Sequence, residues 1–404
     1  MRQLKKENRK ISTVLAFALV PLSGFAMDVY IPSFPQMARD LGASVLDIKL
    51  TLTIYLISYG ISQLFVGSIL DSFGRYKINL ISLVIFVVSS LSIVATKNIG
   101  LIFLFRFIQG IAISFIVVSK RAFLVDVYTG EKRKHYTSML TIIWAIGPIV
   151  APFLGGYLQS GFGWSANFYF LACYGIALLL LELRFSGETI KTKHPFHLKS
   201  IAGVYEKLLS TKSFSLGILV LGLSYSMVMV FAMSIPFIIE QHFHLTPVVS
   251  GYCALASGLS LFMGGLLSKY LIDKPFFKKV QIANTTQLII AGTMLVTAGV
   301  FHALLPIIVF VMLIHFCHGF TYNIFFTSAI TSFPEYAATA SGLASGGSYL
   351  TFSVASYAIV NSINITDQQT LSYSYLILLA LIAVVIIMIK KFADKTVVKQ
   401  ALIA

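Results

Sequence analysis

The chain has 404 residues, of which 57% are hydrophobic and only 11% are charged. No soluble domain of this size needs so much apolar surface, so the composition excludes an ordinary globular enzyme and predicts a helical membrane protein. The formal net charge of +15 raises nucleic-acid binding as an alternative.

Apolar segments recur along the whole chain. A helix of about 20 apolar residues crosses a bilayer, and this length predicts twelve spans, numbered here in chain order. The predicted fold class is an all-α membrane protein with twelve transmembrane helices. The spans lie at roughly 12–35, 48–70, 77–96, 99–119, 137–159, 165–183, 214–239, 248–268, 280–300, 304–328, 336–360 and 371–389.

Basic residues gather in alternate loops. Twenty-six of the 30 lysines and arginines lie in the two tails and in loops 2–3, 4–5, 6–7 and 8–9. The loops on the other side hold only Arg39, Lys49 and Lys97, and Arg106 lies inside span 4. This asymmetry follows the positive-inside rule and predicts that both termini are cytoplasmic. The charge therefore reflects topology, and no nucleic-acid partner is expected.

The longest polar interruption divides the chain into two halves of six spans each. We predict an N-terminal bundle at 1–184, a basic cytoplasmic linker at 185–213 and a C-terminal bundle at 214–404. Within the linker, Ile201–Leu209 is expected to form an amphipathic helix on the inner membrane surface. The linker serves either as a basic tether that sets the topology or as a regulatory segment.

Asp28 lies in the middle of span 1, where an ionised and unpaired carboxylate costs several kcal/mol. Arg106 is the matching cation in span 4, and it shares a helix face with Gln109 and Gly110. A carboxyl group in this setting either loads and releases protons or ties helices together. We favour proton exchange for Asp28.

A short charged turn joins spans 2 and 3. It contains Asp71, Gly74 and Arg75, and it follows Gly67 near the end of span 2. Gly74 permits a tight reversal that a Cβ would resist, and Arg75 marks the turn as cytoplasmic.

Span 5 combines small residues with two proline kink points. Proline removes a backbone hydrogen bond, and glycine lets helices pack closely. Taken by itself, the pattern is explained by ordinary close packing of helices. The residues are Gly147, Pro148, Pro152, Gly155 and Gly156.

Several of these strings resemble motifs of one family. The string from Gly67 to Lys77 resembles the loop 2–3 signature of the major facilitator superfamily, and Arg106, Gln109 and Gly110 resemble its span-4 motif. The span-5 glycines and prolines resemble the motif of its drug:proton antiporters. The strings Met27–Pro35, Ser234–Phe237 with Phe243–Pro247, and Ala338–Leu343 are similar to the bicyclomycin-resistance (Bcr/CflA) type.

The resemblance implies two pseudo-symmetric six-helix bundles that rock about a central cavity. It also implies that Asp28 and Arg106 couple transport to protons. Protonation of Asp28 from outside would weaken its hold on Arg106 and release the substrate. Asp71 and the cations near the end of span 4, Arg121 among them, would close the cytoplasmic side. Two departures weaken that latch: Ser72 and Val125 stand where the family usually has cations.

Spans 1, 4, 7 and 10 line the central cavity in the family, which points to substrate-binding residues there. His315, His318 and Tyr322 form one polar stripe on span 10. The two histidines bind substrate, carry protons or pack against neighbouring helices, and these alternatives stay open. A metal site is not expected, because no third ligand lies nearby. The candidate substrate-binding residues are Tyr30, Gln109, Tyr225, Met229, His315, His318, Tyr322 and Asn323.

Together with the resemblance, these observations predict proton-coupled efflux of small amphipathic compounds of the multidrug type, and the resemblance implies a bacterial inner membrane. The expected partners are a small-molecule substrate, protons and the lipid bilayer, and the protein is expected to be a monomer. No cofactor and no catalytic site are expected, and the proton gradient supplies the energy. Two alternatives are a dedicated exporter of an endogenous metabolite, such as a siderophore, and an uptake symporter of the same fold.

Overall fold

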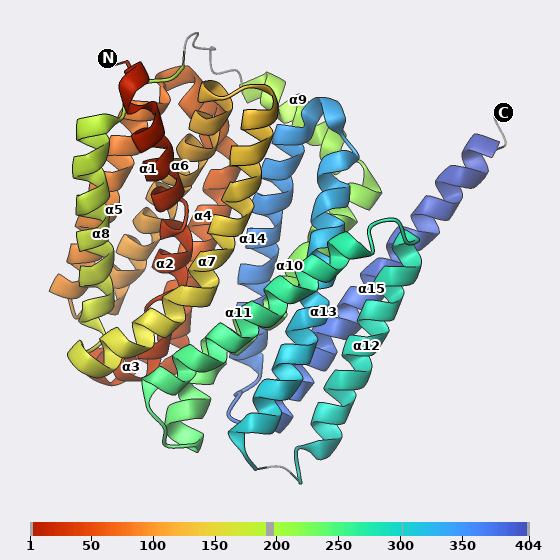
Figure 1. Ribbon diagram of the computed structural model, residues 1–404. Coiled ribbons are helices and arrows are strands. Elements are labelled where there is room, and N and C mark those ends of the chain that lie inside the picture. The colour runs from red at the N-terminus through yellow and green to blue at the C-terminus, as the bar shows by residue number, and fades with distance from the viewer. Residues whose placement is uncertain (1–2, 191–197, 301, 402–404) are drawn as a thin grey trace. The chain divides into compact units, whose positions relative to one another are not determined.

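The computed structural model describes residues 3–190, 198–300 and 302–401. The chain forms two compact units, each described here by itself (Figure 1). Unit 1 comprises Met1–Phe196 and His244–Leu255, and unit 2 comprises His197–Phe243 and Ala256–Ala404. Residues 191–197 of the predicted linker lie outside the described part of the chain.

Unit 1 contains eight helices of its own. The predicted span 1 is interrupted, because Pro21 lies between α1 and α2 and lacks the N–H that would continue the helix. Two short 3₁₀ turns lie at Lys6–Asn8 and Ile31–Ser33. The helices are α1 (Arg9–Leu19), α2 (Leu22–Asp28), α3 (Phe34–Leu41), α4 (Val45–Phe73), α5 (Arg75–Ala95), α6 (Ile99–Val127), α7 (Gly130–Phe162) and α8 (Ser165–Phe185).

Unit 2 begins with the linker helix, and α11 starts in unit 1 and continues into unit 2. A π-helical turn at Ile238–His242 extends α10, and a 3₁₀ turn at Pro334–Tyr336 precedes α14. The remaining helices are α9 (Leu198–Leu209), α10 (Lys212–Phe237), α11 (Pro247–Tyr270), α12 (Phe276–Thr297), α13 (Leu304–Thr331), α14 (Ala337–Ser362) and α15 (Gln368–Ala401).

Each of the twelve predicted spans coincides with one of these helices, or with α1 to α3 in the case of span 1. Within the described residues, nine segments are long and apolar enough to cross a membrane. Helices α7, α12 and α14 are not among the nine, and each of them carries Gly, Ser, Thr or Asn along its length. The predicted all-α membrane fold is confirmed.

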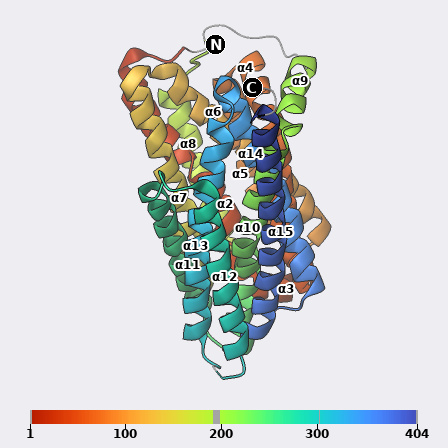
Figure 2. The same cartoon turned by 90° about the vertical axis from the view of Figure 1, so that its right-hand side faces the viewer.

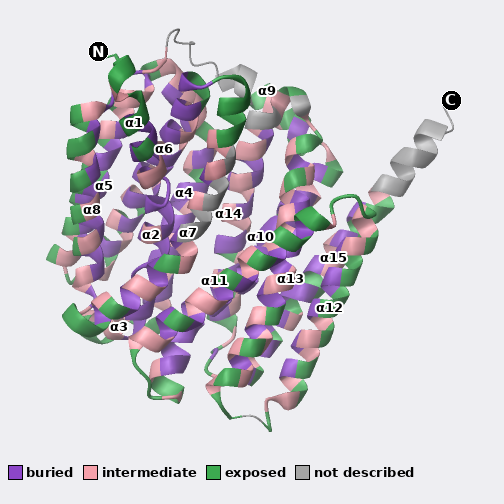
Figure 3. Ribbon diagram, viewed as in Figure 1, coloured by how far each residue is buried: buried purple, intermediate pink, exposed green. Residues whose placement is uncertain are grey.

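Large apolar side chains stay exposed along the outer helices. Val84 and Val88 on α5, Leu180 on α8 and Ile289 on α12 all remain exposed. Figure 3 shows the exposed positions alternating with buried ones along these helices. In water such surfaces would be a liability, whereas lipid tails solvate them. Figure 2 shows α12 and α15 side by side within unit 2.

Glycine allows the tightest helix crossings in both units. A Cβ on Gly110 of α6 would collide with Ser58 and with the carbonyl of Tyr55 on α4. In unit 2, a Cβ on Gly319 of α13 would collide with the carbonyl of Leu261 on α11. Such small-residue contacts let membrane helices approach closely, where van der Waals packing replaces the hydrophobic effect.

Candidate functional site

Arg106 is the largest fully buried side chain in the described structure. Its Nη1 donates to the carbonyl of Ala26, at 3.0 Å, and to Gln109, and its Nη2 donates to the Tyr30 hydroxyl at 3.2 Å. The guanidinium carbon lies 4.4 Å from the ring centroid of Tyr30 and 4.3 Å from that of Tyr55. The planar cation is thus desolvated by aromatic faces and held by neutral acceptors.

Asp28 ends α2 and is buried, two residues beyond the carbonyl that Arg106 contacts. Within the described residues, no ion pair joins the two side chains. Each keeps an unused atom instead: Asp28 Oδ2 and Arg106 Nε are both buried without a hydrogen-bond partner. Arg106 contacts span 1 through the Ala26 carbonyl and the Tyr30 side chain. Asp28 therefore has an acceptor, and Arg106 a donor, that the described residues leave without a hydrogen-bond partner.

Tyr30 and Gln109, predicted to bind substrate, are used here to position Arg106. The Tyr30 hydroxyl also lies 3.0 Å from the Thr51 hydroxyl, and Gln109 donates to Ser90 at 2.8 Å. Both side chains are fully buried. In this conformation their polar atoms hold the arginine, and a substrate-binding role for either stays a prediction.

The span-5 motif packs directly against α2 and the residues that follow it. A Cβ on Gly147 would lie 2.9 Å from the Cα of Gly24, and one on Gly155 would collide with the carbonyl of Val29, the residue after Asp28. Pro148 and Pro152 lie inside α7 beside these contacts. Gly156 packs against Pro247 in the part of α11 that belongs to unit 1. The motif therefore reaches the backbone next to the buried carboxyl group.

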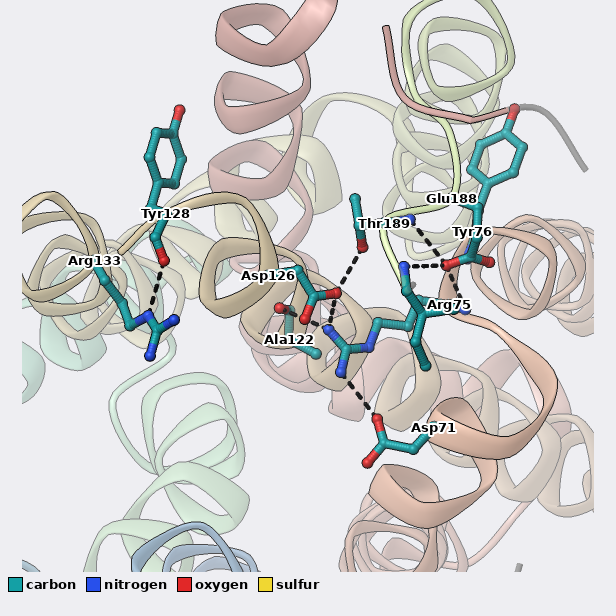
Figure 4. A network of polar contacts seen from close by, with 10 residues as sticks. Asp71, Arg75, Tyr76, Ala122, Asp126, Tyr128, Arg133, Glu188 and Thr189 are labelled. Carbon is teal, nitrogen blue, oxygen red and sulfur yellow. Dashed lines mark hydrogen bonds and ion pairs between the residues drawn. The ribbon is translucent and has the colours of Figure 1, made fainter. Parts of the chain in front are cut away.

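The charged turn between α4 and α5 consists of Gly74 alone, with φ +101°, a value that favours glycine. Arg75 then bridges three groups, as Figure 4 shows. It donates to Asp71 and to the carbonyl of Ala122, each at 2.9 Å, and it pairs with Asp126 on α6. Arg75 thus ties the turn to the end of α6.

Two predicted gating residues lie outside this network in the present conformation, and their gating role stays a prediction. A Cβ on Gly67 would meet nothing within 4 Å. Arg121 makes no hydrogen bond or ion pair within the part of the chain that the structure describes. In this conformation Asp71 pairs with Arg75, and Arg75 pairs with Asp126 on α6. A latch between Asp71 and the cations at the end of span 4 stays a prediction.

Glu188, just beyond α8, is a functional candidate that the sequence analysis missed. Its carboxylate accepts the backbone N–H groups of Arg75 and Tyr76, at 3.3 and 3.2 Å, at the start of α5 (Figure 4). It also accepts those of Thr189 and Ile190. A carboxylate at a helix N-terminus satisfies orphan donors and complements the helix dipole. Glu188 thereby fastens the segment after α8 to the charged turn.

Glu182 is a second acid inside a predicted span that the sequence analysis missed. Glu182 is fully buried near the end of α8 and pairs with buried Lys120 of α6 at 2.5 Å. Asn79 of α5 donates to the same carboxylate at 3.1 Å. An acid within the last turn of an apolar helix was the available signal. The pair and Asn79 tie α5, α6 and α8 together.

In unit 2, the span-10 residues divide into two kinds. His315 is fully partnered, with Nδ1 2.6 Å from Ser257 and Nε2 3.2 Å from Tyr375. Asn323 donates to the carbonyl of Gly265 at 3.0 Å and to Ser268 at 2.7 Å. These two side chains tie α13 to α11 and α15, which is the packing alternative.

His318 is different. It is fully buried, and neither of its ring nitrogens has a hydrogen-bond partner in the described structure. The rings of Tyr225 and Tyr322 lie 5.5 and 5.7 Å from it. Met229 is buried on α10. Within the described residues, no group of three or more His, Cys, Asp or Glu side chains is arranged to hold a metal ion.

The fold and these motifs belong to one family of transporters. The family model described as Major Facilitator Superfamily matches residues 16–356. The chain is therefore a member of the major facilitator superfamily.

Relatives of this chain are bacterial membrane proteins. It is 28% identical to an uncharacterized MFS-type transporter of Bacillus subtilis, over 84% of this chain and 85% of the relative. It is 31% identical to a bicyclomycin resistance protein homolog of Haemophilus influenzae, over 50% of this chain and 51% of the relative. A multidrug resistance protein of Klebsiella pneumoniae is 34% identical over 45% and 46% of the two chains. The two matches to resistance proteins thus span about half of each relative.

Solved structures share the fold at low sequence identity. A D-xylose–proton symporter superposes with a TM-score of 0.71 at 10% identity, over 92% of this chain and 96% of its own. A bacterial homolog of the human lysosomal transporter Spinster gives 0.71 at 15% identity, over 96% and 98%. These likenesses show the fold alone.

Proposed function

We propose that this chain exports small amphipathic compounds from the bacterial cytoplasm in exchange for protons, as a monomer with both termini in the cytoplasm. The resistance proteins among its relatives support an export role. So does the glycine and proline motif of α7 beside Asp28. The basic loops support the orientation. The proton gradient drives the exchange, and no cofactor takes part.

The observation that carries this proposal is the pair of unused atoms, Asp28 Oδ2 and Arg106 Nε. A buried carboxylate needs a cation or a proton. If Asp28 ionises, Arg106 offers a free donor without giving up Ala26 or Tyr30. If Asp28 takes a proton, no ion pair has to break. The two protonation states thus favour two positions of α2 relative to α6.

Export follows if these two positions belong to different transport states. The ionised form binds the compound on the cytoplasmic side, and protonation from outside favours its release. Proton and compound then disfavour each other's binding, which is the coupling free energy of an exchanger. The crossing of α7 with α2 at Gly147 and Gly155 links the movement of α2 to the rest of unit 1.

The test uses everted membrane vesicles with an imposed proton gradient and a panel of drugs and metabolites. We expect at least one compound to dissipate the gradient with the wild-type protein and none to do so with Asp28→Asn. Asp40→Asn is the matched control, because Asp40 is exposed on α3. Gradient-driven transport at the wild-type level in Asp28→Asn would refute proton coupling through this residue.

A dedicated metabolite exporter is the second candidate, favoured by the unpaired polar groups of unit 2. It predicts that a single chemical class in the panel gives a response. A broad response would favour the multidrug type, and accumulation driven by the gradient would favour an uptake symporter.

A further inference from the structure

The interior of unit 2 contains polar groups that have no hydrogen-bond partner among the described residues. His318 on α13 is fully buried with both ring nitrogens unpaired in the described structure. A buried donor or acceptor without a partner bears its whole desolvation cost, so native interiors rarely keep one. In a transporter, a ligand that forms the missing hydrogen bonds explains such a group.

His315 shows that the surrounding helices can satisfy a histidine when packing requires it. It lies three residues before His318 on the same helix and is equally buried. Both of its ring nitrogens have partners, on Ser257 and on Tyr375. The lack of partners at His318 is therefore not a general property of this region.

Thr321, three residues after His318 and on the same side of α13, repeats the pattern. Its hydroxyl is buried and unpaired within the described structure. Helical threonines elsewhere in unit 2 bond back to a carbonyl of their own helix, as Thr293 does to Ile289 at 2.9 Å and Thr331 to Thr327 at 3.0 Å. The Thr321 hydroxyl does not form such a bond to a carbonyl of α13 in the described structure. It therefore remains able to hydrogen-bond a ligand on the same side of the helix as His318.

Aromatic rings surround this pair of unpaired groups. Tyr225 of α10 meets His318 edge-on at 5.5 Å, and Tyr322 meets it at 5.7 Å. Phe352 of α14 lies 4.8 Å from the Tyr225 ring. Tyr322 is partly exposed, whereas Tyr225 and Phe352 are buried. Tyr322 is therefore the most exposed of the three rings.

The interior of unit 2 offers no counter-charge. Among its described residues, no Asp, Glu, Lys or Arg side chain is buried. A permanent cation or anion bound there would stay uncompensated in a low-dielectric interior, which is costly. An uncharged ligand group avoids this cost and can still use an imidazole, which when neutral has one donor and one acceptor.

We propose that His318 and Thr321 bind the hydroxyl group of an uncharged aromatic compound whose ring packs against Tyr225 and Tyr322. The unprotonated ring nitrogen of His318 accepts the hydroxyl hydrogen, and the Thr321 hydroxyl donates to the oxygen. The ring N–H of His318 remains for a second acceptor on the compound. The site is closed in this conformation. This assignment rests on the proposed export function, because it names the class of compound carried.

The test measures binding to the purified full-length protein in lipid nanodiscs, without a proton gradient. The probes are 7-hydroxycoumarin and 7-methoxycoumarin, at a mildly acidic pH where the hydroxyl is protonated, and the cation tetraphenylphosphonium. We expect the wild-type protein to bind the hydroxyl compound about tenfold more tightly than the methoxy compound. His318→Phe should abolish this preference, and the cation should not compete with the hydroxyl compound for the wild-type site.

Thermal unfolding separates this role from a structural one. His318→Phe removes two unpaired polar atoms from an aromatic environment, so its melting temperature should equal or exceed that of the wild type. His315→Phe removes the hydrogen bonds to Ser257 and Tyr375, so its melting temperature should be lower than that of the wild type. Thr321→Val keeps the shape without the hydroxyl, and should reduce the preference if His318→Phe fails to fold.

The proposal is overturned if the wild-type protein binds neither coumarin, if it binds both equally, or if the preference survives both His318→Phe and Thr321→Val. If the protein binds 7-hydroxycoumarin selectively but no compound dissipates the gradient in vesicles, proton exchange is refuted and the assignment of this site is kept. A gradient response to other compounds, with no coumarin preference, would refute the assignment of this site alone.

Discussion

Buried charge in the described structure is confined to unit 1, whereas the buried polar side chains described in unit 2 are neutral residues and histidines. Buried polar groups in unit 2 are Ser, Thr, Asn, Gln and His. The buried charged residues of unit 1 are Asp28, Lys49, Arg106, Lys120, Glu182 and Glu188.

This difference indicates that the two units have different roles in transport. Buried charges respond to protons and to one another over several ångströms, so a unit that contains them can change state on protonation. Neutral polar groups recognise shape and hydrogen-bonding pattern instead. We therefore assign proton handling to unit 1 and recognition of the compound to unit 2. Four substitutions test this contrast.

The largest effect is expected at the buried pair of Glu182 and Lys120. Glu182→Gln leaves the ammonium group of Lys120 buried without a countercharge, and should lower the free energy of unfolding by about 3–5 kcal/mol. Denaturant unfolding in detergent measures this loss. The double variant Glu182→Leu with Lys120→Met should recover most of it, because no charge remains to be compensated. A loss of stability in the double variant as large as in Glu182→Gln would show that the pair itself is needed.

Gly155→Ala places a methyl group against the carbonyl of Val29, next to Asp28. We expect overpacking to lower the free energy of unfolding by about 1–3 kcal/mol. Transport in vesicles should also slow, because α7 and the backbone beside Asp28 must separate to make room for the methyl group. Gly161→Ala, on the same helix, is the control, since nothing lies within 4 Å of the added atom. Equal effects at the two sites would contradict the importance of the α7 crossing.

Glu188→Ala removes the carboxylate that caps α5. Because the N–H groups of Arg75 and Tyr76 lose their acceptor, the free energy of unfolding should fall by about 1–2 kcal/mol. Added salt should reduce this difference from the wild type. Glu131→Ala is the matched control, because Glu131 is exposed and pairs only with exposed Lys134. Hydrogen exchange at the first turn of α5 should speed up in Glu188→Ala alone, and unchanged exchange there would argue against capping.

The smallest effect is expected in unit 2. Gln287 donates to the carbonyl of Ile314 at 3.0 Å, and Gln287→Met should cost only about 1 kcal/mol, because both groups are neutral. Gln369→Met, at an exposed position on α15, should leave unfolding unchanged. A loss at Gln287 that matches the loss at Glu182 would remove the contrast between the two interiors.

Apolar length and motif strings were enough to predict the fold. Runs of about 20 apolar residues cross a bilayer only as helices, so the spans follow from composition. The turn at Gly74 was also predictable, because a charged string separated two apolar runs there. Glu188 was missed because its role depends on meeting the start of α5, more than a hundred residues earlier in the chain.

The sequence by itself determined the helical membrane fold, the family and the position of acid and base in spans 1 and 4, because these depend on local hydropathy and on motifs. Only the tertiary structure decided that Arg106 holds neutral acceptors while its Nε and Asp28 Oδ2 stay unpaired. It also distinguished His315, whose ring nitrogens have hydrogen-bond partners, from His318, whose ring nitrogens have none among the described residues. Helical spacing places both histidines on one stripe, but hydrogen bonds depend on side chains that other helices bring within reach.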